Sequence, residues 1–403
     1  MIEEQRFHRA EELPPPDERP GLLGWLRRNL FNNWYNALQT VVAAWFLFVL
    51  FRLVVVWLVE QAQWGVVTDN VRIFMTGQYP QEQLFRIWLC LHLLAVLIGL
   101  TWGIWVRAHR LAAALILLFP ILLAVFSPEA DSRVHLLVWV GVALVAFILG
   151  RLGGASLRRV TIAGWVLYFP LVLLIIRGVS TQDGWLPVVS SNLWGGLLLT
   201  FLLTIVGILF SFPIGLLLAL GRRSELPVVR WFSVAYIEVI RGVPLITILF
   251  MASTMVPLFL PLGVTIDRVL RAMVGIVIFS SAYLAENVRG GLQAIPRGQY
   301  EAAHAIGLSS IQTMTLIILP QALRLVIPVL VGQFIALFKD TSLVATIGLL
   351  DLLGIARSIL ANPRYISYQH EVLVFITLIY WGISFLMSLF SQRLEAALGV
   401  GQR

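Results

Sequence analysis

Long apolar runs recur along the whole chain, and they constrain the fold more than any other feature of the sequence. A helix needs about 20 mostly apolar residues to cross the hydrocarbon core of a bilayer, where its backbone polar groups must be satisfied internally. The sequence therefore predicts an all-α, polytopic membrane protein with about ten transmembrane helices. The predicted spans are Leu38–Val59, Ile87–Val106, Leu111–Phe126, Val134–Gly150, Val160–Ile176, Leu193–Leu220, Phe232–Leu260, Val269–Val288, Leu323–Phe338 and Val372–Phe390.

Charged residues make up only 12% of the chain, about half the fraction that is typical of a soluble domain. The formal net charge is +8, but the arginines that carry it are scattered between the apolar runs and form no domain-sized basic face. We therefore expect membrane lipid around the helices and no nucleic-acid partner. The six histidines are dispersed and the single cysteine, Cys90, lies in an apolar run, so we predict no metal site and no catalytic residue.

The arginines also predict which loops lie in the cytoplasm, because cytoplasmic loops of membrane proteins are enriched in Lys and Arg. With the N-terminus inside, 17 arginines fall on the cytoplasmic side and eight on the opposite side. This bias places both termini and the loop 289–320 in the cytoplasm. We expect a cytoplasmic tail with an interfacial helix (1–37), extra N-terminal transmembrane helices (38–185), and a core (186–403) in which polar residues and glycines enter the spans.

The most informative segment is the long loop after the eighth predicted span. It contains Glu301-Ala302-Ala303-His304-Ala305-Ile306-Gly307, which predicts a short helix of small residues that ends at glycine. Glu301 is expected near the helix N-terminus, where the dipole favours a negative charge. Pro320 is expected to open the next membrane helix, where its missing N–H costs nothing. The alanines give this helix a low surface that another protein can approach closely, a property that an ordinary interhelical loop does not need.

Residues of this loop carry a specific resemblance. Glu301, Ala302, Ala303, Gly307, Ile317, Leu319 and Pro320 match the cytoplasmic-loop motif of the permeases of bacterial binding-protein-dependent ABC importers. Five further segments resemble the polar amino-acid branch of that family: Arg241–Leu245, Ser281–Glu286, Arg289–Leu292, Pro296–Gln299 and Lys339–Leu343. The resemblance covers residues 190–403, the five-helix core of a type I ABC importer permease. The extra N-terminal spans resemble the longer of the two permeases of general L-amino-acid transporters.

The resemblance implies a function and a set of partners. In this family the loop forms a coupling helix that binds in a groove of the ATPase, so the expected ATPase-coupling residues are Glu301, Ala302, Ala303, Gly307, Leu319 and Pro320. The expected partners are an ATP-binding cassette ATPase dimer, a second, homologous permease and an extracytoplasmic amino-acid-binding protein. The expected location is the bacterial inner membrane.

We expect this chain not to be an enzyme and to bind no cofactor of its own. Its one lysine, Lys339, follows Phe338, so the chain cannot contain a glycine-rich phosphate loop that ends in Gly-Lys-Ser/Thr. ATP and Mg would therefore be bound by the partner ATPase.

Ionisable residues inside the predicted spans are candidate pathway or gate residues, because a charge within the bilayer is costly. Glu238 and Arg241 lie three residues apart on one helix face, as do Glu286 and Arg289. Each of these pairs fits either a structural ion pair that reaches the membrane surface or a gate.

A second polar group consists of Lys339, Asp340, Thr341 and Ser342. These residues follow about sixteen apolar residues, or roughly 24 Å of helix, which places them deep in the membrane. They predict either a helix break that lines a substrate cavity or a buried structural ion pair.

ATP-driven amino-acid import, with this chain forming the translocation pathway, is the leading hypothesis. The alternative is an ion-gradient-driven secondary amino-acid transporter, which would leave the cytoplasmic loop unexplained and for which no inverted repeat stands out. A membrane scaffold would not need the intramembrane polar residues, and a membrane enzyme would need a catalytic constellation that the sequence does not suggest. Which amino acids are carried does not follow from the sequence.

Overall fold

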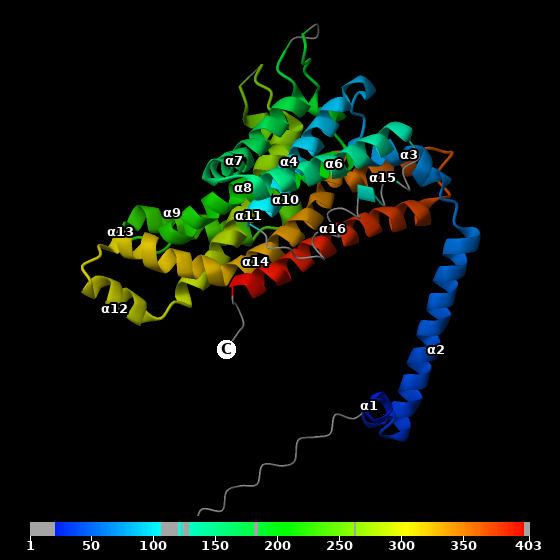
Figure 1. Ribbon diagram of the computed structural model, residues 1–403, viewed down its shortest axis with the longest axis horizontal. Helices are drawn as coiled ribbons and strands as arrows, with labels where there is room; N and C mark the ends of the chain where they lie inside the picture. Colours follow the sequence, from blue (N-terminus) through cyan, green and yellow to red (C-terminus); the bar gives the residue numbers. More distant parts are fainter. Residues whose placement is uncertain are drawn as a thin grey trace, which may run out of the picture. The chain divides into compact units, whose positions relative to one another are not determined.

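The structure is a computed structural model that describes residues 21–105, 120–121, 124, 129–180, 184–261 and 263–398. The described residues are mainly helical, and they contain no strand beyond isolated bridges between pairs of residues (Figure 1). They divide into two units, residues 1–63 and residues 64–403.

The first unit contains two helices. The predicted interfacial segment forms α1 (Leu22–Asn29), which carries Arg27 and Arg28 in its last turn. The helix α2 (Trp34–Val56) continues as a π-helical turn over Trp57–Gln61. The combined helix, Trp34–Gln61, is long and apolar enough to cross a membrane, which agrees with the first predicted span.

The second unit begins with α3 (Gly65–Thr76), α4 (Phe85–Trp105), α6 (Ala130–Leu152) and α7 (Ala155–Arg177), with a short 3-10 turn, Gln81–Gln83, before α4. The last three agree with the second, fourth and fifth predicted spans. The helices α4 and α6 approach closely at Gly99 and Gly103, where a Cβ on Gly103 would lie 2.3 Å from the carbonyl oxygen of Phe147. The third predicted span, 111–126, lies almost entirely outside the described residues.

The core follows a 3-10 turn at Ser191–Leu193. Its long helices are α8 (Gly196–Gly221), α9 (Pro227–Arg241), α11 (Arg268–Gln293), α14 (Leu319–Asp340) and α16 (Gln369–Leu398). The helices α8 and α11 pack side by side, and Leu199, Leu203 and Ile276 are buried together between elements of this core. The sixth, eighth, ninth and tenth predicted spans agree with helical segments Gly196–Gly221, Arg268–Gln293, Ser310–Ile347 and Gln369–Ala396.

The seventh predicted span, Phe232–Leu260, is not one straight helix. The segments Pro227–Arg241 and Leu245–Phe259 are bent by 102° relative to each other. The second segment consists of α10 (Leu245–Phe250), a π-helical turn (Met251–Met255) and a 3-10 turn (Val256–Phe259). Pro244 causes the bend, because proline disfavours helical backbone at the preceding residue and cannot donate a backbone hydrogen bond. The described residues therefore hold eight candidate spans, or nine if the bent pair counts as one.

Two short helices, α3 and α15 (Leu352–Leu360), were not predicted. Both are too short to cross a membrane, and they pack against each other and against the start of α16. Val66 and Phe74 of α3 are buried with Leu352 and Ile355 of α15 and with Val372 of α16. This cluster covers the end of the core opposite α9, α12 (Arg297–Ala305) and α13 (Ser310–Gln312) (Figure 1). The end that carries α12 is called the loop end below.

Candidate functional site

The candidate coupling helix is α12, at the loop end of the core. Two residues after its last residue, Gly307 adopts a φ of 83°, which lies in the left-handed region. The Leu308 N–H donates to the Ala303 carbonyl (3.1 Å) and the Gly307 N–H donates to the His304 carbonyl (2.9 Å). These two bonds form a Schellman cap. The prediction of a short helix that ends at glycine is therefore confirmed.

The surface of α12 is suited to a close protein contact. Ala303 is only 3% exposed and anchors the helix, whereas Ala302 and Ala305 are exposed. Two apolar side chains beyond the helix, Ile306 (75% exposed) and Ile311 (77% exposed), also face outwards. Small exposed residues allow a partner to approach the helix backbone, and the isoleucines offer apolar area that a partner would bury.

The expected position of Glu301 within the helix is wrong. The helix begins at Arg297, so Glu301 lies beyond its first turn, which contains no acidic residue. The helix dipole falls off within that turn and contributes little at this residue. Glu301 is exposed, so its carboxylate is available to a partner.

Leu319 and Pro320 lie inside a continuous helical segment, Ser310–Ile347, and not at its start. The segment begins at α13 with a capping box at Ser309, passes through a π-helical turn over Thr313–Ile318 and continues as α14. Pro320 lies in the first turn of α14, as expected, but helical backbone already precedes it, so it does not mark the start of the whole membrane helix. The preceding π-helical turn explains how proline is tolerated, because it alters the hydrogen-bond pattern where the proline ring would clash with the carbonyl one turn earlier.

Glu286 on α11 lies at the centre of a charge cluster near the loop end. Its carboxylate accepts hydrogen bonds from Arg289 on the same helix, and it lies 3.5 Å from Arg222 Nη1 and 3.8 Å from Arg241 Nη1. Arg222 Nη1 also contacts Glu238 Oε1 at 3.0 Å. All five side chains are partly solvent-exposed, so each pair alone contributes about 0–1 kcal/mol. Together they join the end of α8 to α9 and α11.

The predicted pairing within this cluster is half correct. Glu286 pairs with Arg289, as expected from their spacing on one helix. Glu238 and Arg241 do not pair with each other: Glu238 contacts Arg222, and Arg241 contacts Glu286. Arg222 follows α8 directly, and the short turn to α9 brings its side chain over Glu238. From the sequence, Arg222 was only one of the 17 arginines assigned to the cytoplasmic side.

Lys339, Asp340, Thr341 and Ser342 lie where α14 ends and a 3-10 helix, Thr341–Ile347, begins. The helix therefore changes from α to 3-10 geometry at these residues, but helical backbone continues to Ile347, so the predicted helix break is not found here. Thr341 is buried and its hydroxyl donates to the Phe338 carbonyl at 2.7 Å. Lys339 is exposed, and neither it nor Asp340 forms an ion pair with any residue in the described part of the chain. The interpretation of these residues as a buried ion pair is therefore wrong.

Asp351, which the sequence reasoning missed, is fully buried beyond this 3-10 helix. Its carboxylate caps α15 by accepting from the N–H groups of Leu353 (3.3 Å) and Gly354 (3.0 Å), and it accepts from the Tyr380 hydroxyl (3.2 Å). Burial raises the pKa of Asp351 to about 6. An aspartate directly before an apolar run is the usual sequence signal of a helix N-cap, and it could have identified this role.

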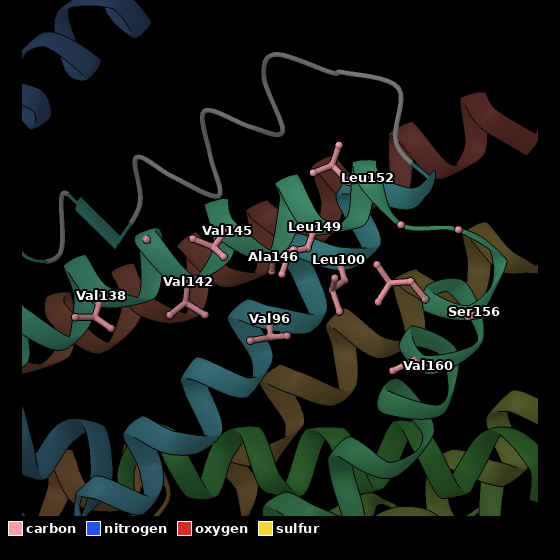
Figure 2. A pocket seen from close by; sticks show the side chains of 14 residues that line it. Val96, Leu100, Val138, Val142, Val145, Ala146, Leu149, Leu152, Ser156 and Val160 are labelled. Atoms are coloured by element: carbon pink, nitrogen blue, oxygen red, sulfur yellow. The ribbon is translucent and has the colours of Figure 1, made fainter.

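Figure 2 shows a groove of about 1020 Å³ between α4, α6 and α7. Its lining consists of apolar residues and glycines, with Ser156 as the exception. A groove with so few polar groups cannot orient an amino acid by its charges. No group of three or more His, Cys, Asp or Glu side chains in the described part of the chain could hold a metal ion.

Residues 211–400 match the family model described as "Binding-protein-dependent transport system inner membrane component". With the apolar helices and the capped loop helix, this match defines the class of protein: a multi-pass inner-membrane component of a binding-protein-dependent transport system.

Similar proteins narrow the class. The chain is 40% identical over 399 residues to the inner membrane amino-acid ABC transporter permease protein YhdY of Escherichia coli (strain K12). The aligned region covers 94% of this chain and 93% of YhdY. The chain is 34% identical over 454 residues to the glutamate/glutamine/aspartate/asparagine transport system permease protein BztC of Rhodobacter capsulatus, over 97% of this chain and 98% of that one. A probable glutamine ABC transporter permease protein, GlnP of Bacillus subtilis, is 36% identical over 50% of this chain and 92% of its own length. The chain belongs to the family of amino-acid ABC transporter permeases.

Proposed function

We propose that this chain forms the translocation pathway of an amino-acid importer and receives the energy of ATP hydrolysis from a separate ATPase through α12. The observation that carries the proposal is the geometry of α12: a helix held by a Schellman cap, with exposed alanines and two exposed isoleucines beyond it. A loop with this surface would otherwise expose apolar area to water without a purpose.

We further propose that the loop end faces the cytoplasm, with both chain termini on that side. The distribution of arginines supports this orientation, because most of them flank the spans on the side of the 289–320 loop. In Figure 1 the C-terminal end of α16 points toward the loop end, which agrees with a cytoplasmic C-terminus.

The proposed partners follow from the family and from the loop. An ATP-binding cassette ATPase dimer would bind α12 and supply ATP and Mg, a second permease would complete the pathway, and an extracytoplasmic binding protein would deliver the substrate. This chain would hydrolyse no ATP, because its sequence lacks the glycine-rich phosphate loop.

The proposed pathway lies in the core. Lys339, Asp340, Thr341 and Ser342 would form part of it where α14 passes into the 3-10 helix. An exposed amine beside a partly buried acid and the partly buried Ser342 hydroxyl can bind both charged groups of an amino acid, and the buried Thr341 would support them. Glu238, Arg241, Glu286 and Arg289 would act nearer the loop end. Their shared contacts favour a scaffold that positions α9 and α11 over a substrate site.

We propose polar amino acids as substrates. The relative from Rhodobacter capsulatus, whose name specifies glutamate, glutamine, aspartate and asparagine, matches nearly the whole chain. Unlabelled competitors in an uptake assay would identify the individual substrates.

The test is uptake of labelled amino acids by cells with and without this chain, with the membrane potential and pH gradient collapsed and ATP maintained. Uptake that depends on the chain and survives this treatment supports ATP-driven import. Uptake that disappears with the gradients would instead indicate an ion-gradient-driven transporter, the alternative to which family membership gives no support.

A further inference from the structure

The turn between α8 and α9 carries two adjacent arginines that contact different parts of the core. Arg223 Nη1 donates to the Tyr300 hydroxyl on α12 at 3.1 Å, and its guanidinium lies 5.7 Å from the centre of the Tyr300 ring. Arg222 Nη1 contacts Glu238 at 3.0 Å and Glu286 at 3.5 Å. One short turn therefore touches the coupling helix with one side chain and the charge cluster with the next.

The turn itself is held firmly. The N–H of Arg223 donates to the Leu220 carbonyl (3.0 Å) and the N–H of Ser224 donates to the Gly221 carbonyl (3.0 Å). Gly221 is packed so tightly on α9 that a Cβ there would lie 2.3 Å from Ser233 Oγ. Because the backbone between the two arginines has little freedom, a displacement of Arg223 displaces Arg222 as well.

The far side of the cluster reaches the bend between α9 and α10. Arg241 is the last residue of α9, and its Nη1 lies 3.8 Å from Glu286. Its guanidinium also lies 5.6 Å from the centre of the Tyr283 ring of α11. The next three residues contain the 102° bend. Glu286 is therefore the common contact of the arginine at the bend and the arginine of the turn.

We propose that the Arg222–Arg223 turn is a positioning element for transport, which links movement of α12 to the bend between α9 and α10 through Tyr300, Arg223, Arg222, Glu286 and Arg241. The proposal rests on the proposed function, in which the ATPase binds α12. A second link holds the start of α12 to α14, where Gln321 Nε2 donates to Gln299 Oε1 at 3.1 Å. That link ends on α14. Tyr300 also packs in the apolar cluster that contains Ile237 of α9, so the turn adds a polar, directional path from α12 to the bend beside this apolar contact.

The test is a double-mutant cycle in the complex purified through a tag on this chain and reconstituted in lipid vesicles. The measured quantity is the number of amino acids imported per ATP hydrolysed, with a mixture of labelled glutamate, glutamine, aspartate and asparagine. Tyr300→Phe removes the hydroxyl contacted by Arg223, and Glu286→Gln removes the charge at the other end. We expect each variant to lower this ratio by about threefold, within the range for residues that transmit coupling.

The decisive result is the double variant. Tyr300 and Glu286 lie on different helices, and in the described part of the chain no hydrogen bond or ion pair joins them; distant independent sites give effects that multiply. If both act in one link, the double variant loses about threefold; an approximately ninefold loss, or an unchanged ratio in Tyr300→Phe, would overturn the proposal. Arg230→Gln is the control, because Arg230 is an exposed arginine of α9 with no ion pair to a described residue.

Two further measurements test the contact between Arg223 and Tyr300 and the proposed function separately. Arg223→Lys keeps the charge but not the planar contact with the Tyr300 ring, so its ratio should fall between those of the native chain and Arg223→Gln. Equal ratios in these two variants would contradict the proposed geometry. If the native complex imports amino acids without hydrolysing ATP, the proposed function fails; if it is coupled and the variants are equally coupled, only the link fails.

Discussion

Substitution of Gly307 would test the docking role of α12 through the backbone alone. The φ of Gly307 is 83°, a conformation that L residues rarely adopt. No atom lies within 4 Å of the position that a Cβ would take there, so Gly307→Ala adds backbone strain without a steric clash. Gly307→Pro changes more, because proline fixes φ near about −65° and removes the N–H that donates to the His304 carbonyl.

The expected magnitudes differ between the two substitutions. Alanine in the left-handed region costs roughly 1–2 kcal/mol, which corresponds to about a 5- to 30-fold decrease in the ratio of capped to uncapped loop. Proline cannot form the cap at all. We therefore expect the rate of amino-acid uptake to decrease from the native chain to Gly307→Ala and to approach background in Gly307→Pro.

The assay measures the initial rate of uptake in cells, normalised to the amount of chain in the membrane, together with ATP hydrolysis by the purified complex. Gly298→Ala is the matched control. Gly298 lies within α12 and also has no atom within 4 Å of an added Cβ, so alanine adds the same methyl group in a backbone conformation that it favours. This control should transport at the native rate.

Two outcomes would refute the reasoning. Normal uptake by Gly307→Pro, with a normal amount of chain in the membrane, would show that the cap of α12 is not needed for coupling. An equal loss in Gly298→Ala would show that the added methyl group, and not the backbone, is responsible.

Three further predictions concern other parts of the molecule. Lys339→Met should reduce the initial uptake rate about tenfold or more, the effect of losing a charge-assisted hydrogen bond to substrate, and normal uptake would exclude Lys339 from the pathway. Burial raises the pKa of Asp351 to about 6 in the folded chain, so between about pH 4 and 6 the folded chain keeps the Asp351 proton that the unfolded chain has lost. This difference contributes about 3 kcal/mol to the free energy of unfolding. The contribution is complete below about pH 4 and is lost as the pH rises through 6. In Asp351→Asn the midpoint of thermal unfolding of the solubilised protein should therefore change less between these pH values than in the native chain. The same pH dependence in both proteins would contradict this assignment. Gly103→Leu should destabilise the chain by about 1–3 kcal/mol and lower the same midpoint, because its Cβ would lie 2.3 Å from a carbonyl oxygen of α6, whereas Gly141→Ala, with open space around it, should not.

Most of the candidate membrane-spanning helices and the form of the loop helix could be predicted from the sequence. The predicted spans that fall on described residues correspond to apolar helices, and Gly307 ends α12 in a left-handed conformation. These features depend on local properties, namely the length of an apolar run and the backbone freedom of glycine. The start of α12 was less predictable, because Glu301 was expected near the helix N-terminus, whereas the helix begins four residues earlier, at Arg297.

The candidate site was predicted less completely, and the charge cluster shows why. An arginine side chain can reach partners on several neighbouring helices, so spacing along one helix does not decide its contact. Glu286 and Arg289 pair as their spacing indicates, whereas Glu238 and Arg241 take partners from other helices.

The sequence by itself determined that the chain is dominated by helices long and apolar enough to cross a bilayer, and that a short helix ended by glycine follows α11. Only the tertiary structure decided that α9 and α10 meet at 102°, that Arg222 joins the charge cluster and that Asp351 is buried beneath α15. The physical reason is the range of the forces involved. Hydrophobic length and glycine conformation act within a few residues, whereas ion pairs and burial depend on which helices cross, and that is fixed only when the whole core packs.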